Sequence, residues 1–139
     1  PGYYGCEAGL CCVGDHFAWL ADNFASSEVR MAAEKEEIPP IKYLVKLAAA
    51  KRPGETGLVA LDWWNGNRNV LVNGELTGLI VGMTLQTRAE DILRALIEAT
   101  AFGTRVIFDT FRSAGVTVST FTAAGGIARK DKHLLCFQA

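Results

Sequence analysis

Apolar residues recur at helical spacing in three parts of the chain. The first lies within Gly9–Phe24, and a second, shorter helix is predicted over Ile41–Lys51, where Pro53 prevents continuation. A long helix follows Thr87-Arg88-Ala89-Glu90, whose hydroxyl and carboxylate are predicted to form a capping box. This helix should end near Gly115, because glycine readily adopts the left-handed conformation after a helix. Its apolar face consists of Ile92, Leu93, Leu96, Ile97, Ala99, Phe102, Val106, Ile107 and Phe111.

Three other segments have the pattern of β-strands. Gly57–Asp62 is almost entirely apolar, which predicts a strand buried on both faces. Thr77–Met83 is a second apolar run, and Val116–Thr122 alternates and is rich in β-branched residues. Between the first two helices, Ala25–Pro40 is polar and should be exposed and partly helical. The alternation of helix and strand predicts an α/β fold with helices packed against a sheet.

Composition narrows the class of protein further. The chain has 139 residues, enough for one domain with a hydrophobic core, and 50% of them are apolar. A net charge of -1 without a basic stripe argues against nucleic acid and anionic membrane as partners. The longest stretch without charged residues, Ser113–Ala128, is too rich in Ser, Thr and Gly for a membrane span. With no secretory signal in view, we expect a cytoplasmic protein with reduced cysteines.

Both ends of the chain suggest that it is part of a longer protein. It begins at Pro1 rather than at Met, and residues 131–139 have the pattern of the first turns of another amphipathic helix. The apolar side chains of that helix, Leu134, Leu135 and Phe137, still need a core. We therefore expect the chain to have been cut from a longer sequence.

Three cysteines and one histidine lie close together in the N-terminal sequence, and two kinds of reactive site could be built from them. Cys6, Cys11, Cys12 and His16 could ligate a metal, since thiolate and imidazole suit zinc. Alternatively, Cys11 or Cys12 could act with His16 as a nucleophile and base. The spacing contains no Cys-x-x-Cys pair, so buried, unreactive thiols on the first helix are the simpler interpretation. The fourth cysteine, Cys136, is expected to be reduced like the others. We expect no metal site.

Two places carry side chains suited to a sugar. Glu7, near the start of the first predicted helix, could accept hydrogen bonds from hydroxyls, or it could be a first-turn charge that favours the helix dipole. Trp63 and Trp64, beside Asn67 and Arg68, are typical of a carbohydrate-binding surface, in which aromatic rings stack on C–H groups. Buried tryptophans that cover a strand end explain the same pattern equally well.

Other polar residues have simple structural interpretations. Asp62 is one carboxylate at a strand end, without a partner in the sequence pattern. Arg94, Glu98 and Arg105 on the long helix are most simply surface ion pairs. Gly125-Gly126 follows a predicted strand and precedes a helix, where a backbone can approach a nucleotide closely or merely turn tightly.

Four segments carry a resemblance to known proteins: Gly5–Gly9, Val13–Trp19, Gly57–Arg68, and Thr77–Gly82 followed by Ala95–Arg105. Together they closely resemble the FGGY carbohydrate kinases, and the Leu-Asp-Trp-Trp-Asn-Gly-Asn-Arg run is specific to the ribulokinase branch of that family. The resemblance covers nearly the whole chain, from Gly2 to about Ile127, although Cys6 and Leu10 stand where the family commonly has Tyr and Gln.

The resemblance implies an actin-like ATPase fold, of the ribonuclease H-like, sugar kinase and Hsp70 superfamily, with helices on a mixed sheet. It implies that residues 1–139 are part of the C-terminal domain and that the N-terminal domain is absent. Glu7 would contact the ketose, and Ala124, Gly125 and Gly126 would lie along ATP. The catalytic aspartate and the phosphate loops of the family lie upstream, so no catalytic residue is expected within this chain.

The function implied by the resemblance is that of an ATP- and Mg²⁺-dependent kinase of carbohydrate metabolism, acting in arabinose catabolism. The whole protein would phosphorylate L-ribulose to its 5-phosphate, and the isolated chain would be inactive, because phosphoryl transfer needs several loops at once. A kinase of another sugar, such as xylulose or ribitol, is an alternative. So is a noncatalytic remnant that forms a homo-oligomer through an exposed apolar face.

Overall fold

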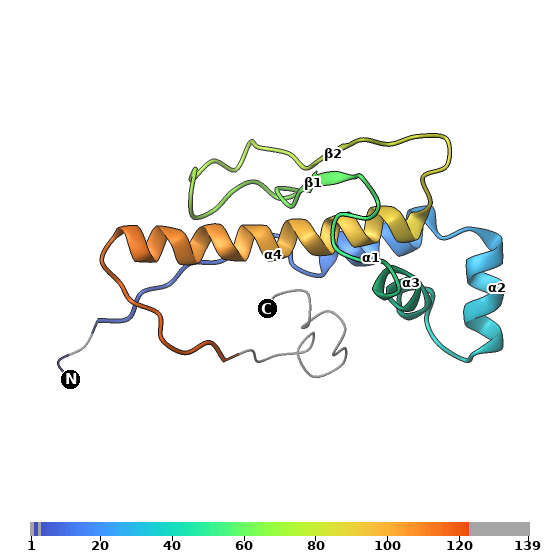
Figure 1. Ribbon diagram of the computed structural model, residues 1–139, viewed down its shortest axis with the longest axis horizontal. Helices are drawn as coiled ribbons and strands as arrows, with labels where there is room; N and C mark the ends of the chain where they lie inside the picture. The colour runs from blue at the N-terminus through green and yellow to red at the C-terminus, as the bar shows by residue number, and fades with distance from the viewer. Residues whose placement is uncertain (1, 3, 123–139) are drawn as a thin grey trace.

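The computed structural model describes residues 2 and 4–122. Figure 1 shows the long helix α4 as the axis of this part, with two short strands along one side and α3 on the other. The elements in chain order are α1 (Asp15–Phe24), α2 (Ser27–Lys35), α3 (Pro40–Ala49), β1 (Val59–Leu61), β2 (Leu79–Val81) and α4 (Ala89–Ser113). This arrangement confirms the α/β fold class, with helices packed on a small sheet.

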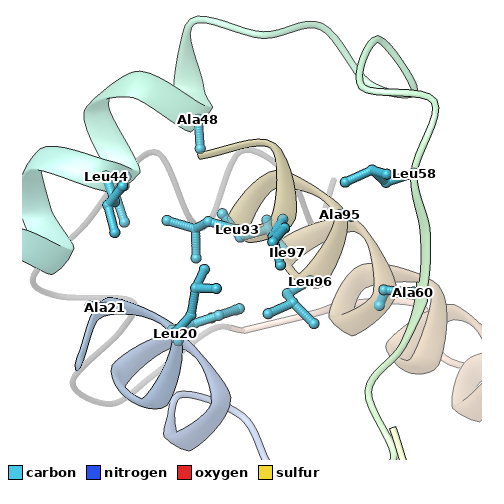
Figure 2. Packing of buried hydrophobic residues seen from close by; sticks show 14 residues of the cluster. Leu20, Ala21, Leu44, Ala48, Leu58, Ala60, Leu93, Ala95, Leu96 and Ile97 are labelled. Carbon is cyan, nitrogen blue, oxygen red and sulfur yellow. The ribbon is translucent and has the colours of Figure 1, made fainter. Parts of the chain in front are cut away.

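The hydrophobic core lies where α1, α3 and α4 meet. Leu20 of α1, Leu44 of α3, and Leu93 and Leu96 of α4 are completely buried there. Figure 2 shows these leucines directed toward one another, with Leu58 and Ala60 at the side of the cluster nearest the sheet. The apolar spacing in the sequence therefore identified the buried residues in the first half of α4, because residues three or four apart lie on one side of a helix. Farther along α4 the predicted face is wrong, since Phe102 and Val106 are 67% and 45% exposed.

The first three helices are close to the prediction, with different starts. Helix α1 begins at Asp15 rather than near Gly9, after Gly14 with a φ of 101°. The polar excursion contains a full helix, α2, whose N-cap Ser26 accepts a hydrogen bond from the Val29 N–H at 3.3 Å. A serine N-cap satisfies one of the N–H groups that have no partner within the helix. Helix α3 has Pro40 in its first turn, where the missing N–H costs nothing.

The long helix is confirmed, but the predicted capping box is wrong by one residue. Helix α4 is capped by Arg88, whose backbone N–H donates to Asp91 Oδ2 at 2.8 Å. The Thr87 hydroxyl instead accepts a hydrogen bond from the Thr84 N–H, also at 2.8 Å, and so stabilises the preceding turn. Gly115 ends the helix as predicted, with a φ of 80° and its N–H donated to the Arg112 carbonyl.

Strands β1 and β2 form an antiparallel pair, with Val59 opposite Val81 and Ala60 opposite Ile80. Ala60 is buried on the side of α4, whereas Val59 is 68% exposed and Val81 is 54% exposed. The prediction that Gly57–Asp62 is buried on both faces is therefore wrong within the described structure. Helix α4 packs against β1, and on the opposite face of the pair Val59, Leu79 and Val81 are at least half exposed.

The predicted strand at Val116–Thr122 is not observed. These residues form no ladder with any part of the chain that the structure describes, although the Phe121 ring packs edge-on against Phe108 at 5.5 Å. Alternation specifies two faces, but a strand also needs a partner for its N–H and C=O groups. The predicted helix over residues 131–139 lies outside the described residues. Among the helices described, none is long and apolar enough to cross a membrane.

Candidate functional site

Glu7 lies on an extended segment, eight residues before α1 begins. Its side chain is 85% exposed, and the acidic residue in the first turn of α1 is Asp15. The interpretation of Glu7 as a first-turn charge is therefore wrong, because the helix dipole acts only near the helix terminus. An exposed carboxylate outside the first turn of a helix is accessible to ligand groups that donate hydrogen bonds.

A loop over residues 62–74 follows β1 and is closed by its own backbone. The N–H and C=O groups of Asn67 and Asn73 exchange two hydrogen bonds of 2.9 Å. The Asn67 side chain also accepts hydrogen bonds from the N–H groups of Val70 and Leu71, at 3.1 and 2.9 Å. Gly66 makes the closure possible, since its φ is 80° and an added Cβ would lie 2.7 Å from Gly74 Cα.

This loop lies against the segment that carries Glu7. The Asn69 side-chain amide donates a hydrogen bond to the Gly9 carbonyl, although 60 positions separate the two residues. Beside it, Arg68 Nη2 lies 3.6 Å from Glu7 Oε1. Two motifs that the sequence presents separately, Gly-Cys-Glu-Ala-Gly and Trp-Trp-Asn-Gly-Asn-Arg-Asn, therefore form one site. The sequence pattern singled out both motifs but contained no signal that joins them.

A cavity of about 300 Å³ lies between this loop, the segment before α1 and the middle of α4. Its walls are mostly apolar, and Asp62 is the acidic side chain in its lining. Asp62 is only 6% exposed, and its Oδ2 accepts no hydrogen bond from the described residues. Burial disfavours the charged carboxylate and raises the pKa of Asp62. Apolar wall residues are Leu10, Ala60, Leu61, Ala99, Phe102, Val106 and Ile107.

The two adjacent tryptophans have different surroundings. The Trp64 ring packs 4.6 Å from that of Trp19, and its Nε1 donates to the Leu61 carbonyl at 3.2 Å. Gly78 lies against the same ring, where an added Cβ would be 2.5 Å from Nε1. Trp64 therefore covers the strand end, as the structural alternative predicted. Trp63 contributes instead to the lining of the cavity.

The described cysteines lie outside α1, whereas His16 lies within it. All three described cysteines precede α1, so the prediction that they lie on the first helix is wrong; Cys6 is exposed and Cys12 is buried. His16 Nδ1 is hydrogen-bonded to the Cys12 carbonyl, and Nε2 lies 3.4 Å from Thr100 Oγ1. Desolvation lowers the pKa of His16 and raises the pKa of the Cys12 thiol, which favours both neutral forms.

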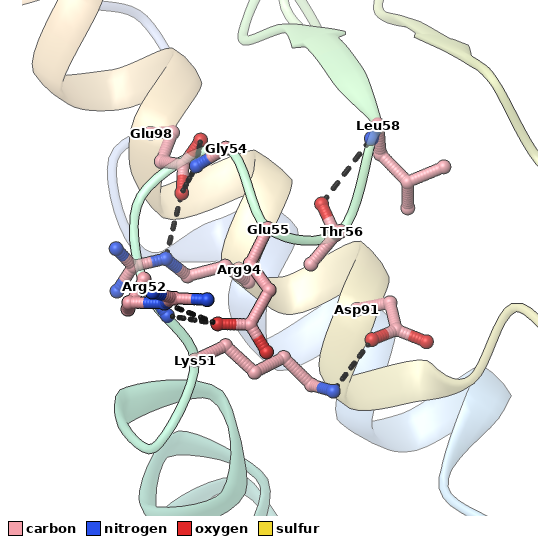
Figure 3. Close-up of polar contacts among 9 residues, drawn as sticks. All are labelled: Lys51, Arg52, Gly54, Glu55, Thr56, Leu58, Asp91, Arg94 and Glu98. Carbon is pink, nitrogen blue, oxygen red and sulfur yellow. Dashed lines mark hydrogen bonds and ion pairs between the residues drawn. The ribbon is translucent and has the colours of Figure 1, made fainter.

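The charged residues of α4 are only partly as predicted. Arg94 is completely buried, and its Nε donates to Glu98 Oε1 at 2.6 Å, so the expectation of a surface ion pair is wrong there. Figure 3 shows Glu98 also accepting a hydrogen bond from the Gly54 N–H, at 3.1 Å, which ties the loop before β1 to α4. Arg105 pairs with Asp109 at 3.1 Å on the exposed surface. The charged side chains Arg94 and Glu98 of α4 therefore have a structural role.

Ala124, Gly125 and Gly126, the predicted nucleotide-binding residues, lie outside the described residues. Within residues 2 and 4–122, no group of three or more His, Cys, Asp and Glu side chains is arranged to hold a metal ion.

Known proteins that are similar to this chain include ribulokinases. The ribulokinases of Anoxybacillus flavithermus and Geobacillus thermodenitrificans are each 56% identical to this chain over 135 residues. The matched region is 97% of this chain and 24% of either ribulokinase, so the chain spans about a quarter of their length.

Solved structures of sugar kinases share the fold. The xylulose kinase from Rhodospirillum rubrum matches 91% of this chain and 23% of its own, with a TM-score of 0.72 and 25% identity. Plasmodium falciparum glycerol kinase, at 23% identity and a TM-score of 0.62, matches 82% of this chain and 22% of its own. These likenesses confirm the expected actin-like ATPase fold of sugar kinases. The model for the C-terminal domain of the FGGY family of carbohydrate kinases matches residues 1–139, and the chain therefore belongs to that family.

Proposed function

We propose that this chain is the C-terminal part of an ATP-dependent L-ribulokinase whose N-terminal domain lies upstream. The whole protein transfers the γ-phosphoryl group of ATP to the terminal hydroxyl of L-ribulose, giving the 5-phosphate, in the cytoplasmic catabolism of arabinose. The observation that carries this proposal is the 56% identity to two ribulokinases over 97% of the chain. The comparison with xylulose kinase, at 25% identity, is much weaker.

In this proposal, the chain supplies binding groups and the upstream domain supplies the catalytic ones. The Glu7 carboxylate accepts hydrogen bonds from the ketose hydroxyls, for which its exposure of 85% leaves it accessible. Ala124, Gly125 and Gly126 contact ATP through backbone N–H groups. The catalytic aspartate, the phosphate loops and the groups that position Mg²⁺ belong to the upstream part. The isolated chain should therefore be inactive, since positioning and charge stabilisation come from several loops together.

The direct test is an assay of the full-length protein that contains this chain. ADP release should be measured with L-ribulose, D-xylulose and ribitol at equal concentrations, with the isolated 139-residue chain assayed beside it. The highest kcat/KM is expected for L-ribulose, with no turnover by the isolated chain. A higher kcat/KM for D-xylulose or ribitol would replace the proposed substrate, and no turnover with any sugar would overturn the proposal.

A noncatalytic, self-associating role is the second candidate. It is favoured by the exposed apolar side chains on the outer face of the sheet, Val59, Leu79 and Val81, which are 50–68% exposed. Apolar patches of this kind promote association. Sedimentation of the isolated chain over a range of concentrations distinguishes the two ideas when it is combined with the kinase assay: a stable dimer together with an inactive full-length protein supports this candidate.

A further inference from the structure

The charged side chain nearest to Glu7 comes from a distant part of the sequence. Arg68 Nη2 lies 3.6 Å from Glu7 Oε1, and the two side chains are 64% and 85% exposed. Attraction between them restricts the directions that the carboxylate can take, while exposure leaves carboxylate oxygen available to a ligand. An ion pair this exposed is weak unless the surrounding chain holds its partners in place.

The residues on either side of Arg68 provide that support. Asn67 closes the loop through two backbone hydrogen bonds of 2.9 Å with Asn73, and its side chain accepts two more from the following turn. Asn69 is bonded to the Gly9 carbonyl, two residues after Glu7. Arg68 therefore stands between two anchored asparagines, one fixing the shape of the loop and the other fixing its distance from the Glu7 segment.

We propose that Arg68 is a positioning residue for sugar binding, which holds the Glu7 carboxylate in the orientation that accepts the ketose hydroxyls. Asn67 and Asn69, on either side of Arg68, fix the backbone that carries it. This inference rests on the proposed function, because it gives Arg68 a role through Glu7.

The test uses the full-length kinase and measures KM for L-ribulose, KM for ATP and kcat separately. Arg68→Ala should raise the KM for L-ribulose about 5-fold, the size expected for an exposed ion pair, with the KM for ATP unchanged. Arg68→Lys should restore the KM to within about 2-fold of the original, because a single contact at 3.6 Å needs charge more than the planar fork of arginine. Arg105→Ala is the matched control, since Arg105 is 70% exposed and paired with Asp109 on α4.

A double-mutant cycle separates positioning from a general electrostatic effect. In the background of Glu7→Gln, Arg68→Ala should change the KM for L-ribulose by less than about 2-fold, because the residue that it positions has lost its charge. Equal effects in both backgrounds would overturn the inference, as would a rise in the KM for ATP or an Arg105→Ala variant that matches Arg68→Ala. Activity of the unaltered protein on L-ribulose tests the proposed function independently of these variants.

Discussion

The leucines of the helical cluster and the valines of the sheet are similarly apolar, yet they lie in opposite surroundings. Leu20, Leu44 and Leu93 are completely buried, whereas Val59 is 68% exposed and Val81 is 54% exposed. Helices α1, α3 and α4 pack against one another, so each apolar stripe faces another one. The sheet packs against α4 with one face only. The element that packs opposite a residue therefore decides whether the residue is buried, whereas an apolar side chain only makes burial favourable.

The largest expected effect comes from removing a side chain at the centre of the helical cluster. Leu93→Ala should lower the free energy of unfolding by about 2–5 kcal/mol, because it removes buried methyl groups and leaves a cavity. Val59→Ala on the outer face of the sheet is the control and should change it by less than about 0.5 kcal/mol. Urea unfolding followed by tryptophan fluorescence measures both. Similar losses in the two variants would contradict the comparison.

A second prediction concerns Gly103, where α4 packs closely against Asp62 at the end of β1 and against Leu10. A Cβ at this position would lie 2.8 Å from Asp62 Oδ2 and 3.0 Å from a Leu10 methyl group. Gly103→Ala should therefore destabilise the fold by about 1–3 kcal/mol, despite the higher helix propensity of alanine. Gly74→Ala is the matched control, since nothing lies within 4 Å of its added Cβ. Adding Asp62→Ala to the Gly103 variant should recover part of the loss, and no recovery would show that the crowding lies elsewhere.

The third prediction is that stability depends on pH through His16 of α1. His16 is buried, and desolvation holds its folded-state pKa below the ordinary value of 6.5. As the pH falls below 6.5, the unfolded chain binds a proton before the folded chain does, so the free energy of unfolding should decrease. The decrease should stop below the folded pKa. Unfolding curves between pH 7.5 and 5 measure this slope, and His16→Gln should remove it.

Asp62 at the edge of the sheet should have the opposite slope. Desolvation raises its folded-state pKa above the ordinary value of 3.8, so the folded chain keeps a proton that the unfolded chain has lost. Stability therefore decreases as the pH rises above 3.8, up to the folded pKa. Asp62→Asn should remove this contribution while leaving that of His16. If Asp62→Asn instead removed the His16 slope, the two groups would be coupled and the two regions would not titrate independently.

The smallest expected effect concerns α2, where little is buried. Ala33 is the one residue of α2 that is fully buried, so the helix depends more on local hydrogen bonds than α1 and α3 do. Ser26→Ala removes the N-cap and should cost about 0.5–1 kcal/mol. Ser27→Ala, one residue later, is the control that keeps the cap. Equal destabilisation by both would show that the hydroxyl of Ser26 has no capping role.

Prediction from the sequence was accurate where local rules are sufficient. The buried residues in the first half of α4 followed from apolar spacing, and the end of α4 followed from Gly115. The start of α4 was misplaced by one residue because Thr87 and Asp91 both have oxygens that can accept backbone hydrogen bonds there. The sequence shows that side chains able to cap a helix are present, but the conformation of the preceding turn decides which of them caps α4.

Prediction was inaccurate where a residue depends on distant neighbours. The alternation of Val116–Thr122 could not show whether another strand stands beside it, and the apolar run of β1 could not show that one of its faces is exposed. Arg94 was expected on the surface, yet it is completely buried. Its pairing with Glu98 was correctly included among the expected ion pairs, since residues four apart on a helix are always neighbours.

The sequence by itself determined the helices, the family and the residue types available for binding a sugar, because each depends on neighbouring positions or on motifs that the chain carries intact. Only the tertiary structure decided that Glu7 meets Arg68, that Asn69 bonds to Gly9, and that Asp62 is buried beside α4. These contacts join segments about 40 to 60 positions apart. Their formation depends on the path of the whole chain around the core, which no local pattern contains.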